Sequence, residues 1–117
     1  MELVKQFDLT DPKILWKGSI DDEFTDDLVI VLLRKTSTYP ELELRHFKLD
    51  NAESMRYIGK IPSPGYMNPD FRQIISITLR EHGKDKVVEA IRHLETIEFV
   101  KCAEPNGIEF PGSPATE

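Results

Sequence analysis

Residues 21–27 form the densest group of side chains in the sequence that suggest metal chemistry. They include five carboxylates: Asp21, Asp22, Glu23, Asp26 and Asp27. Calcium-binding loops place oxygen ligands at alternate positions around a central glycine, but Phe24 stands where that turn belongs. A solvated acidic segment that leads into a strand is therefore the interpretation that we favour.

The histidines and the cysteine are the other side chains with catalytic or metal-binding chemistry. His82 and His93 lie roughly 16 Å apart along an axis if both are helical, which is too far to share a metal ion. Cys102 as a nucleophile needs a histidine and an orienting acid beside it, whereas a cysteine in a strand is usually a small buried apolar residue. We expect no metal, no cofactor and no catalytic residue, so the protein is not predicted to be an enzyme.

The C-terminal stretch suggests binding rather than catalysis. A strand-like end over residues 99–103 runs into a turn signal and then into two apolar side chains, Ile108 and Phe110. These are costly to leave in water, so docking of the segment is favoured over an unordered terminus. The predicted partner-binding residues are Glu104, Pro105, Asn106, Gly107, Ile108, Glu109 and Phe110.

Composition limits the classes of function. The chain has 117 residues and 39% hydrophobic residues, which suits one domain with a modest core. No apolar run reaches the length of a membrane span, and MELVKQFDLT has no features of a signal peptide. The net charge of −6, without a basic run, argues against nucleic-acid binding. A single cysteine leaves the redox compartment undecided.

The elements that must position these residues follow from periodicity. The continuous apolar run of residues 28–33 predicts a central strand that is buried on both faces. Alternation at Ile75, Ile77 and Leu79 predicts a strand with one buried face. After Gly83, helical spacing runs from Val87 to Ile97, and a last strand is expected at about residues 98–103.

The segment between residues 40 and 61 is less regular. A short helix within residues 41–49 and a strand over residues 53–61, interrupted at Gly59, are the expectations there. Before residue 24, Leu15 and Trp16 look like a pair that docks on the domain. We divide the chain into an N-terminal lead-in (1–23), an α+β domain (24–108) and a C-terminal tail (109–117).

This order of elements predicts an α+β fold. It is the ferredoxin-like βαββαβ sandwich, a four-stranded antiparallel sheet with helices on one face. Acylphosphatases share that fold and hold a phosphoryl group with an arginine and an asparagine. Arg34 or Arg72 with Asn68 have the right types, but nothing in their spacing brings them together.

Two stretches resemble a known family. Residues 75–79, 84–95 and 100–106 (ISITL, KDKVVEAIRHLE and VKCAEPN) resemble the end of subtilisin-like protease propeptides, in which a strand, a helix and a strand closing in AEPN follow one another. Residues 16–33 look like the opening of prodomain-like modules of large secreted bacterial, mainly clostridial, proteins. Residues 36–68 depart from the pattern.

The resemblance implies a function. Such a prodomain packs its exposed sheet face on two helices of a subtilisin-like protease, in cis or in trans, and lays its C-terminal tail in the active-site cleft. It assists folding of the protease and inhibits it, and it has no small-molecule substrate. The resemblance also implies a secreted, extracellular bacterial location. Because no catalytic domain lies in this sequence, the alternative is a non-catalytic structural or protein-interaction module of a secreted protein.

Overall fold

The protein folds as an α+β structure with a four-stranded antiparallel sheet, as the sequence predicts at that level. The structure, a computed structural model, describes residues 3–36, 41–62 and 71–107. Within these residues it has one α-helix and two short 3₁₀-helices. In chain order the elements are η1 (Leu3–Gln6), β1 (Phe24–Leu33), η2 (Leu44–Phe47), β2 (Ala52–Pro62), β3 (Phe71–Leu79), α1 (Lys84–Leu94) and β4 (Val100–Gly107).

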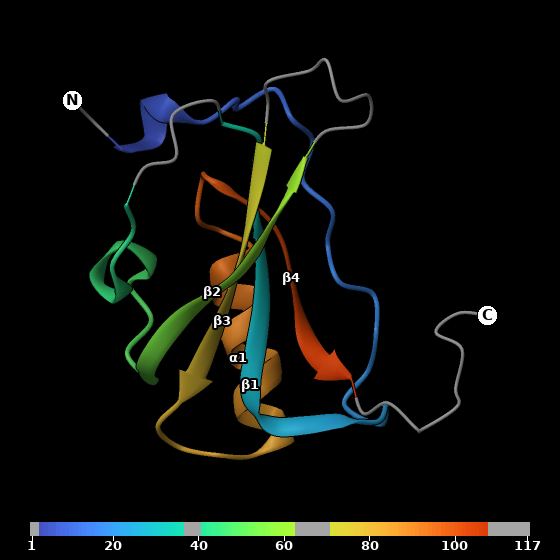
Figure 1. The fold of residues 1–117 in the computed structure, drawn as a ribbon. Coiled ribbons are helices and arrows are strands. Elements are labelled where there is room, and N and C mark those ends of the chain that lie inside the picture. Colours follow the sequence, from blue (N-terminus) through green and yellow to red (C-terminus); the bar gives the residue numbers. More distant parts are fainter. Residues whose placement is uncertain (1–2, 37–40, 63–70, 108–117) are drawn as a thin grey trace.

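The strands lie in the order β2-β3-β1-β4, and every neighbouring pair is antiparallel. Strands β3 and β4 therefore run parallel to each other, with β1 between them, and α1 forms the connection. Figure 1 shows α1 behind the sheet, so that one face of the sheet is covered and the other faces the viewer. The expected central position of residues 28–33 is confirmed.

The expectation that this strand is buried on both faces is wrong. Val29, Val31 and Leu33 are fully buried, but the alternate residues Leu28, Ile30 and Leu32 are only partly buried. The reason is that α1 contacts only one face of the sheet, so every second side chain of β1 has no layer above it within the described residues.

The core forms where α1 meets the covered face. Alternation in β3 places Ile75, Ile77 and Leu79 there, and the helical stripe adds Val87, Ala90, Ile91 and Leu94. Gly83 is the N-cap before the helix, with φ at 141°, a conformation that a side chain would strain, and Asp85 lies in the first turn, where the helix dipole favours an anion. Three aromatic rings close one end of the core, with Phe99 centred 5.2 Å from Phe7 and 5.5 Å from Phe47.

The less regular segment folds much as its pattern indicates. The expected short helix within residues 41–49 is η2, a single 3₁₀ turn. Strand β2 shifts its register between Tyr57 and Gly59, which is the expected interruption. A bulge of this kind adds one residue to the strand and bends it.

Strand β4 is longer than predicted. It runs from Val100 to Gly107 rather than over residues 98–103, because Glu104 and Pro105 continue the ladder opposite Ile30 and Val29. Proline cannot donate a ladder hydrogen bond, but β4 is an edge strand, where proline is tolerated.

The N-terminal segment is fastened along the other side of β4. We call residues 8–19 the strap; Figure 1 shows it, in blue, passing beside β4. The Ile14 N–H donates to the Lys101 carbonyl at 2.8 Å. The Lys101 ammonium donates to the buried carboxylate of Asp11 at 2.9 Å, and that carboxylate also accepts from the Lys35 N–H. These contacts hold the strap at the end of the β1–β4 pair where β1 finishes and β4 begins.

Leu15 and Trp16, the pair expected to dock on the domain, lie in different environments. Trp16 packs against the core, edge-on to Phe24, and the Trp16 backbone N–H donates to the Glu95 carboxylate, whereas Leu15 is 55% exposed. The guanidinium of Arg92 lies 5.6 Å from the centre of the Trp16 ring and donates to the Trp16 carbonyl. One residue of the pair holds the strap to α1, and the other points outward.

Lys13 makes the second set of contacts between the strap and the end of α1. Its ammonium donates to the carbonyls of Glu95, Ile97 and Val100 at 2.5–2.9 Å. Burial lowers the pKa of Lys13, and repulsion from Arg34 lowers it further, whereas Glu95 and Glu98 act in the opposite direction. The last carbonyls of a helix lack partners within the helix, and here a charged donor satisfies those just beyond the end of α1.

The buried end of α1 gives a first prediction. Leu94→Ala removes a side chain with no exposed surface and should lower the free energy of unfolding by about 2–5 kcal/mol, measured by urea denaturation. The matched variant Leu15→Ala changes an exposed leucine and should alter it by less than about 0.5 kcal/mol. Equal effects of the two substitutions would contradict the assigned core.

The strap gives a second prediction. Lys13→Met keeps the aliphatic stem but removes the ammonium that donates to three carbonyls, of which that of Ile97 still accepts from the Val100 N–H, so we expect a loss of about 1–3 kcal/mol in the free energy of unfolding. Lys17→Met is the control, because Lys17 is an exposed lysine of the same segment. If Lys13→Met proves as mild as Lys17→Met in thermal and urea unfolding, the strap is not held as described.

Candidate functional site

The face of the sheet opposite α1 is the strongest candidate for a functional site; we call it the open face. The strand registers align its residues in rows across all four strands. One row contains Arg56 on β2, Ser76 on β3, Ile30 on β1 and Glu104 on β4. This row therefore begins with a cation at one edge of the sheet, crosses Ser76 and Ile30 and ends with a carboxylate at the other edge.

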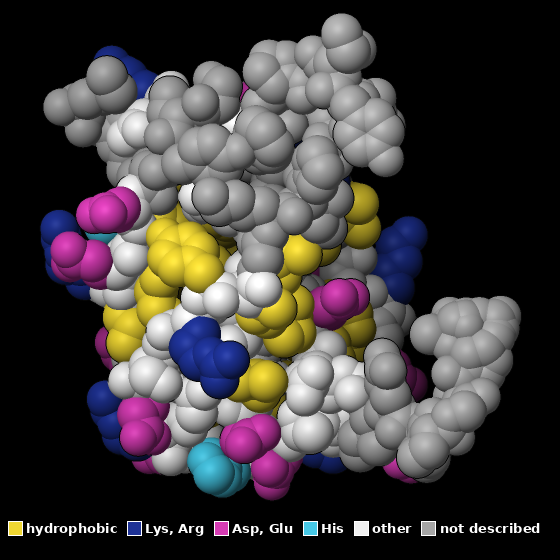
Figure 2. All heavy atoms as spheres, in the orientation of Figure 1, with side chains coloured by type: hydrophobic (Ala, Val, Ile, Leu, Met, Phe, Trp, Pro, Cys, Tyr) yellow, Lys and Arg dark blue, Asp and Glu magenta, His cyan; other side chains and the backbone are white. Residues whose placement is uncertain are grey.

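The next row is more apolar. It contains Gly59, Ile74, Leu32 and Cys102, in the same order of strands. Ile74, Leu32 and Cys102 are each partly exposed. Figure 2 shows hydrophobic side chains gathered over the middle of this face, with charged side chains of both signs around them. The centre of the open face is thus apolar surface that a partner can cover.

Two hollows mark this surface. One, of about 150 Å³, lies on the open face and is lined by Ile30, Leu32, Ile74, Cys102 and Glu104. The other, of about 340 Å³, lies between the strap and β4, where Ile14 and Leu15 are exposed. Cys102 and Glu104 line both hollows. The apolar surface therefore continues from the open face around the edge of β4 to the strap.

The structure divides the predicted partner-binding segment. Glu104, Pro105, Asn106 and Gly107 belong to β4, and the Asn106 amide donates to the Thr25 hydroxyl at 3.4 Å. Ile108, Glu109 and Phe110 lie outside the described residues. The first four residues are therefore held in the sheet, and Glu104 borders the open face; their role in binding stays a prediction.

The histidines and the acidic residues that were considered for metal binding or catalysis do not form a common site in the described residues. His93 bonds to the Phe47 carbonyl, the ring of His46 accepts from the Glu43 N–H in the cap of η2, and His82 is exposed. Among the described residues, no three histidine, cysteine, aspartate or glutamate side chains are placed to hold a metal ion. In the acidic segment, the Asp22 carboxylate accepts from the Ser19 N–H, which is a local turn contact.

The arginine and asparagine of the acylphosphatase comparison are not brought together. The Arg34 guanidinium donates to the Glu98 carbonyl at 2.8 Å, so it binds the loop before β4. Asn68 and the Arg72 side chain lie outside the described residues.

Among the described residues, the structure contains no helix with the length and apolar character of a membrane span.

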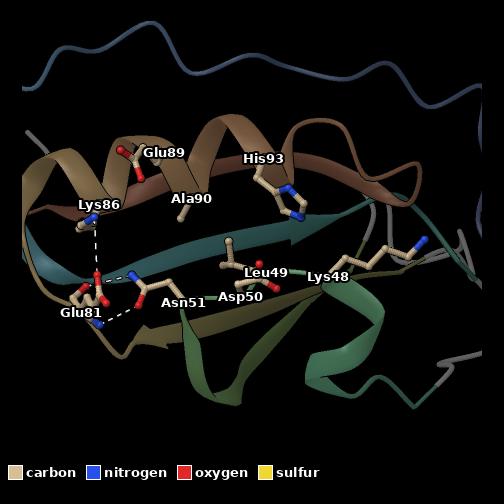
Figure 3. Close-up of a pocket in the computed structure, with 9 residues that line it drawn as sticks. All are labelled: Lys48, Leu49, Asp50, Asn51, Glu81, Lys86, Glu89, Ala90 and His93. Carbon is tan, nitrogen blue, oxygen red and sulfur yellow. Dashed lines mark hydrogen bonds and ion pairs between the residues drawn. The ribbon is translucent and has the colours of Figure 1, made fainter.

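A further hollow, of about 270 Å³, lies between α1 and the connection from η2 to β2 (Figure 3). Asn51 exchanges two hydrogen bonds with the backbone of Glu81, and Lys86 lies 3.6 Å from the Glu81 carboxylate. Figure 3 shows that the helix adds His93 and Glu89 above Lys48 and Asp50. Because cations and anions are mixed around it, the lining selects no ligand class.

Comparison with family models, with curated proteins and with solved structures found no match in any of the three.

The sequence held an unused signal for the open face. Residues 28–33 are apolar at every position, yet only one stretch of the chain has clear helical periodicity. One helix covers one face of a sheet, so the second apolar side of β1 had to be open or covered by something else. The sequence predicts that the strand of residues 28–33 is buried on both faces. For that reason it does not identify the site residues of the open face, which are Arg56, Ile30, Leu32 and Ile74.

Cys102 gives a direct test of the open face. It is the single cysteine of the chain and is partly exposed in the sheet. In native protein dilute enough to be monomeric, we expect one thiol per chain to react with a small thiol reagent, at a rate that does not change with urea below the unfolding transition. A rate that rises steadily with urea would mean that labelling requires unfolding, and the face would then not be open.

Proposed function

We propose that the protein is a subtilase prodomain-like module that binds a subtilisin-like protease, assists its folding and inhibits it. The proposal rests on the resemblance of residues 75–106 to such propeptides and on the architecture described above. The module acts without chemistry of its own. A secreted bacterial location belongs to the same proposal.

The arrangement of strands supports this proposal. The order β2-β3-β1-β4, with α1 between β3 and β4, matches the strand order of the ferredoxin-like split β-α-β fold. In that comparison, η2 stands at the place of the first helix. We propose that the module is a ferredoxin-like domain in which a 3₁₀ turn and the strap replace one helical layer.

The observation that carries the proposal is the open face. Its central side chains Ile30, Leu32 and Ile74 are apolar and partly exposed, and no layer of the described chain covers them. Covering apolar surface contributes about 25 cal/mol of favourable binding free energy per Å² removed from water. A pair of surface helices on a protease is a fitting partner, because a helix, α1, already covers the opposite face of the same sheet.

Glu104 is the residue that we propose binds the N-terminus of a protease helix. Its exposed carboxylate ends a row of the open face at the β4 edge. Helix N-termini carry partial positive charge and unpaired N–H groups, so a carboxylate at the rim of the contact can bind the end of a partner helix. Glu104 lies beside Ile30 in a described row of this face.

The segment after β4 completes the proposed contact. Strand β4 ends at Gly107, opposite Phe24, and residues 108–110 follow. An extended segment binds a protease cleft by pairing main-chain groups with a strand edge, with alternate side chains in pockets. A module that binds the folded protease and not the unfolded one stabilises the folded form, which is how it assists folding.

The test is inhibition of purified subtilisin-like proteases, beginning with any encoded beside this gene, in assays with a chromogenic peptide. We expect competitive inhibition by the full chain. Ile30→Glu places an unpaired charge in the open face, which the protease would cover, and should weaken inhibition by roughly tenfold or more. Ile20→Glu makes the same change at an exposed residue outside the open face and should leave inhibition unchanged.

Truncation after Gly107 separates the two halves of the proposed contact. A chain of residues 1–107 keeps all of β4 and should still bind a catalytically inactive protease while inhibiting the active one more weakly. Absence of inhibition by the full chain across the panel would contradict the proposal. Undiminished inhibition by the truncated chain would exclude the tail from the cleft, and binding to a natural partner that is not a protease would favour the interaction module instead.

A further inference from the structure

The open face is complementary to itself. Each copy presents Arg56 at the β2 edge and Glu104 at the β4 edge of one row, with Ser76 and Ile30 between them. Both charged side chains are exposed. Their strands are three spacings apart, about 14 Å, so the two charges do not meet within one copy. A second copy can bring them together.

A two-fold axis parallel to the strands, midway between two facing sheets, gives the required geometry. Rotation about such an axis exchanges the two edges, so β2 of one copy lies over β4 of the other and β3 lies over β1. Sheets that pack face to face lie about 10 Å apart, with strands within about 30° of alignment. Two-fold interfaces are self-complementary: if one residue contacts another, the reverse contact also forms.

The rows then match along their whole length. Arg56 of each copy meets Glu104 of the other, which gives two ion pairs at opposite edges. In the more apolar row, Leu32 of each copy meets Ile74 of the other. Ile30 meets Ser76, a large side chain against a small one. The shallow hollow beside Ile30 and Leu32 offers room for a side chain of the facing copy.

We propose that the free protein forms a two-fold dimer through its open face, with Arg56–Glu104 pairs across the interface. This goes beyond the proposed function, because it assigns a partner, a second copy of this chain, and does not depend on a protease. It also has a regulatory consequence. If the open face binds a protease, the dimer and the protease complex exclude each other.

The test uses charge reversal on each side of the predicted pair. Wild-type protein should sediment as a dimer that dissociates on dilution, within about 10 μM to 1 mM. The copies each carry a charge of −6, so the measurements belong at physiological ionic strength, where repulsion beyond about 8 Å is screened. Arg56→Glu and Glu104→Arg each create two like-charge contacts and should weaken the dimer by roughly tenfold or more.

Mixing the two variants gives the decisive result. Arg56→Glu with Glu104→Arg restores opposite charges at both edges of a mixed dimer, although neither variant pairs well with itself. We expect heterodimers with about the wild-type affinity, which native mass spectrometry distinguishes from both homodimers. The double variant, with both charges exchanged, should dimerise with itself.

Matched controls separate the pair from net charge and from folding. Arg45→Glu and Glu89→Arg make the same changes in net charge at exposed residues of η2 and α1, and should dimerise like the wild type. Circular dichroism melts confirm that each variant folds. A wild-type protein that stays monomeric to about 1 mM overturns the proposal, as do single reversals that dimerise normally or a mixture that forms no heterodimer.

Discussion

The packing of α1 against one face of the sheet is the contact on which the rest of the structure depends. It buries the alternate residues of β1 together with the helical stripe, in a core that also contains those of β3, and β1 lies between β3 and β4. The connection from β3 through α1 to β4 must pass over one face, so the same contact leaves the opposite face without a layer. Strand β1 is nevertheless apolar on both sides, and this mismatch between a two-sided strand and a one-sided helix defines the candidate site.

The strap compensates for part of what a second helical layer would supply. An edge strand carries unpaired backbone N–H and C=O groups that can pair with a further strand. Here the Ile14 N–H occupies one carbonyl of β4, while Lys13 and Trp16 hold the segment against the end of α1. The buried Asp11–Lys101 pair adds a second point of attachment near the end of β1. The lead-in residues are thus integrated with the edge of the sheet by polar contacts as well as by packing.

The open face connects the two proposals. A surface with an apolar centre and charges of opposite sign at its edges suits a protease that presents helices and also suits a second copy of the chain. The two partners differ in what they require from Glu104. A helix N-terminus would bind its carboxylate through backbone N–H groups, whereas the dimer would bind it through Arg56. Reversal of Arg56 therefore distinguishes the dimer from a protease contact that does not use that residue.

The sequence by itself determined the elements whose signals are local. Alternation at residues 75–79, the helical spacing after Gly83 and the register break near Gly59 each reflect neighbours along the chain, and each appears in the structure. The tertiary structure alone decided the end of β4, the separation of Trp16 from Leu15 and the identity of the open face. These depend on which strand lies beside which and on where a single helix packs. Arg56 and Glu104 are distant in sequence and carry no periodic signal, and only the strand registers place them at opposite ends of one row.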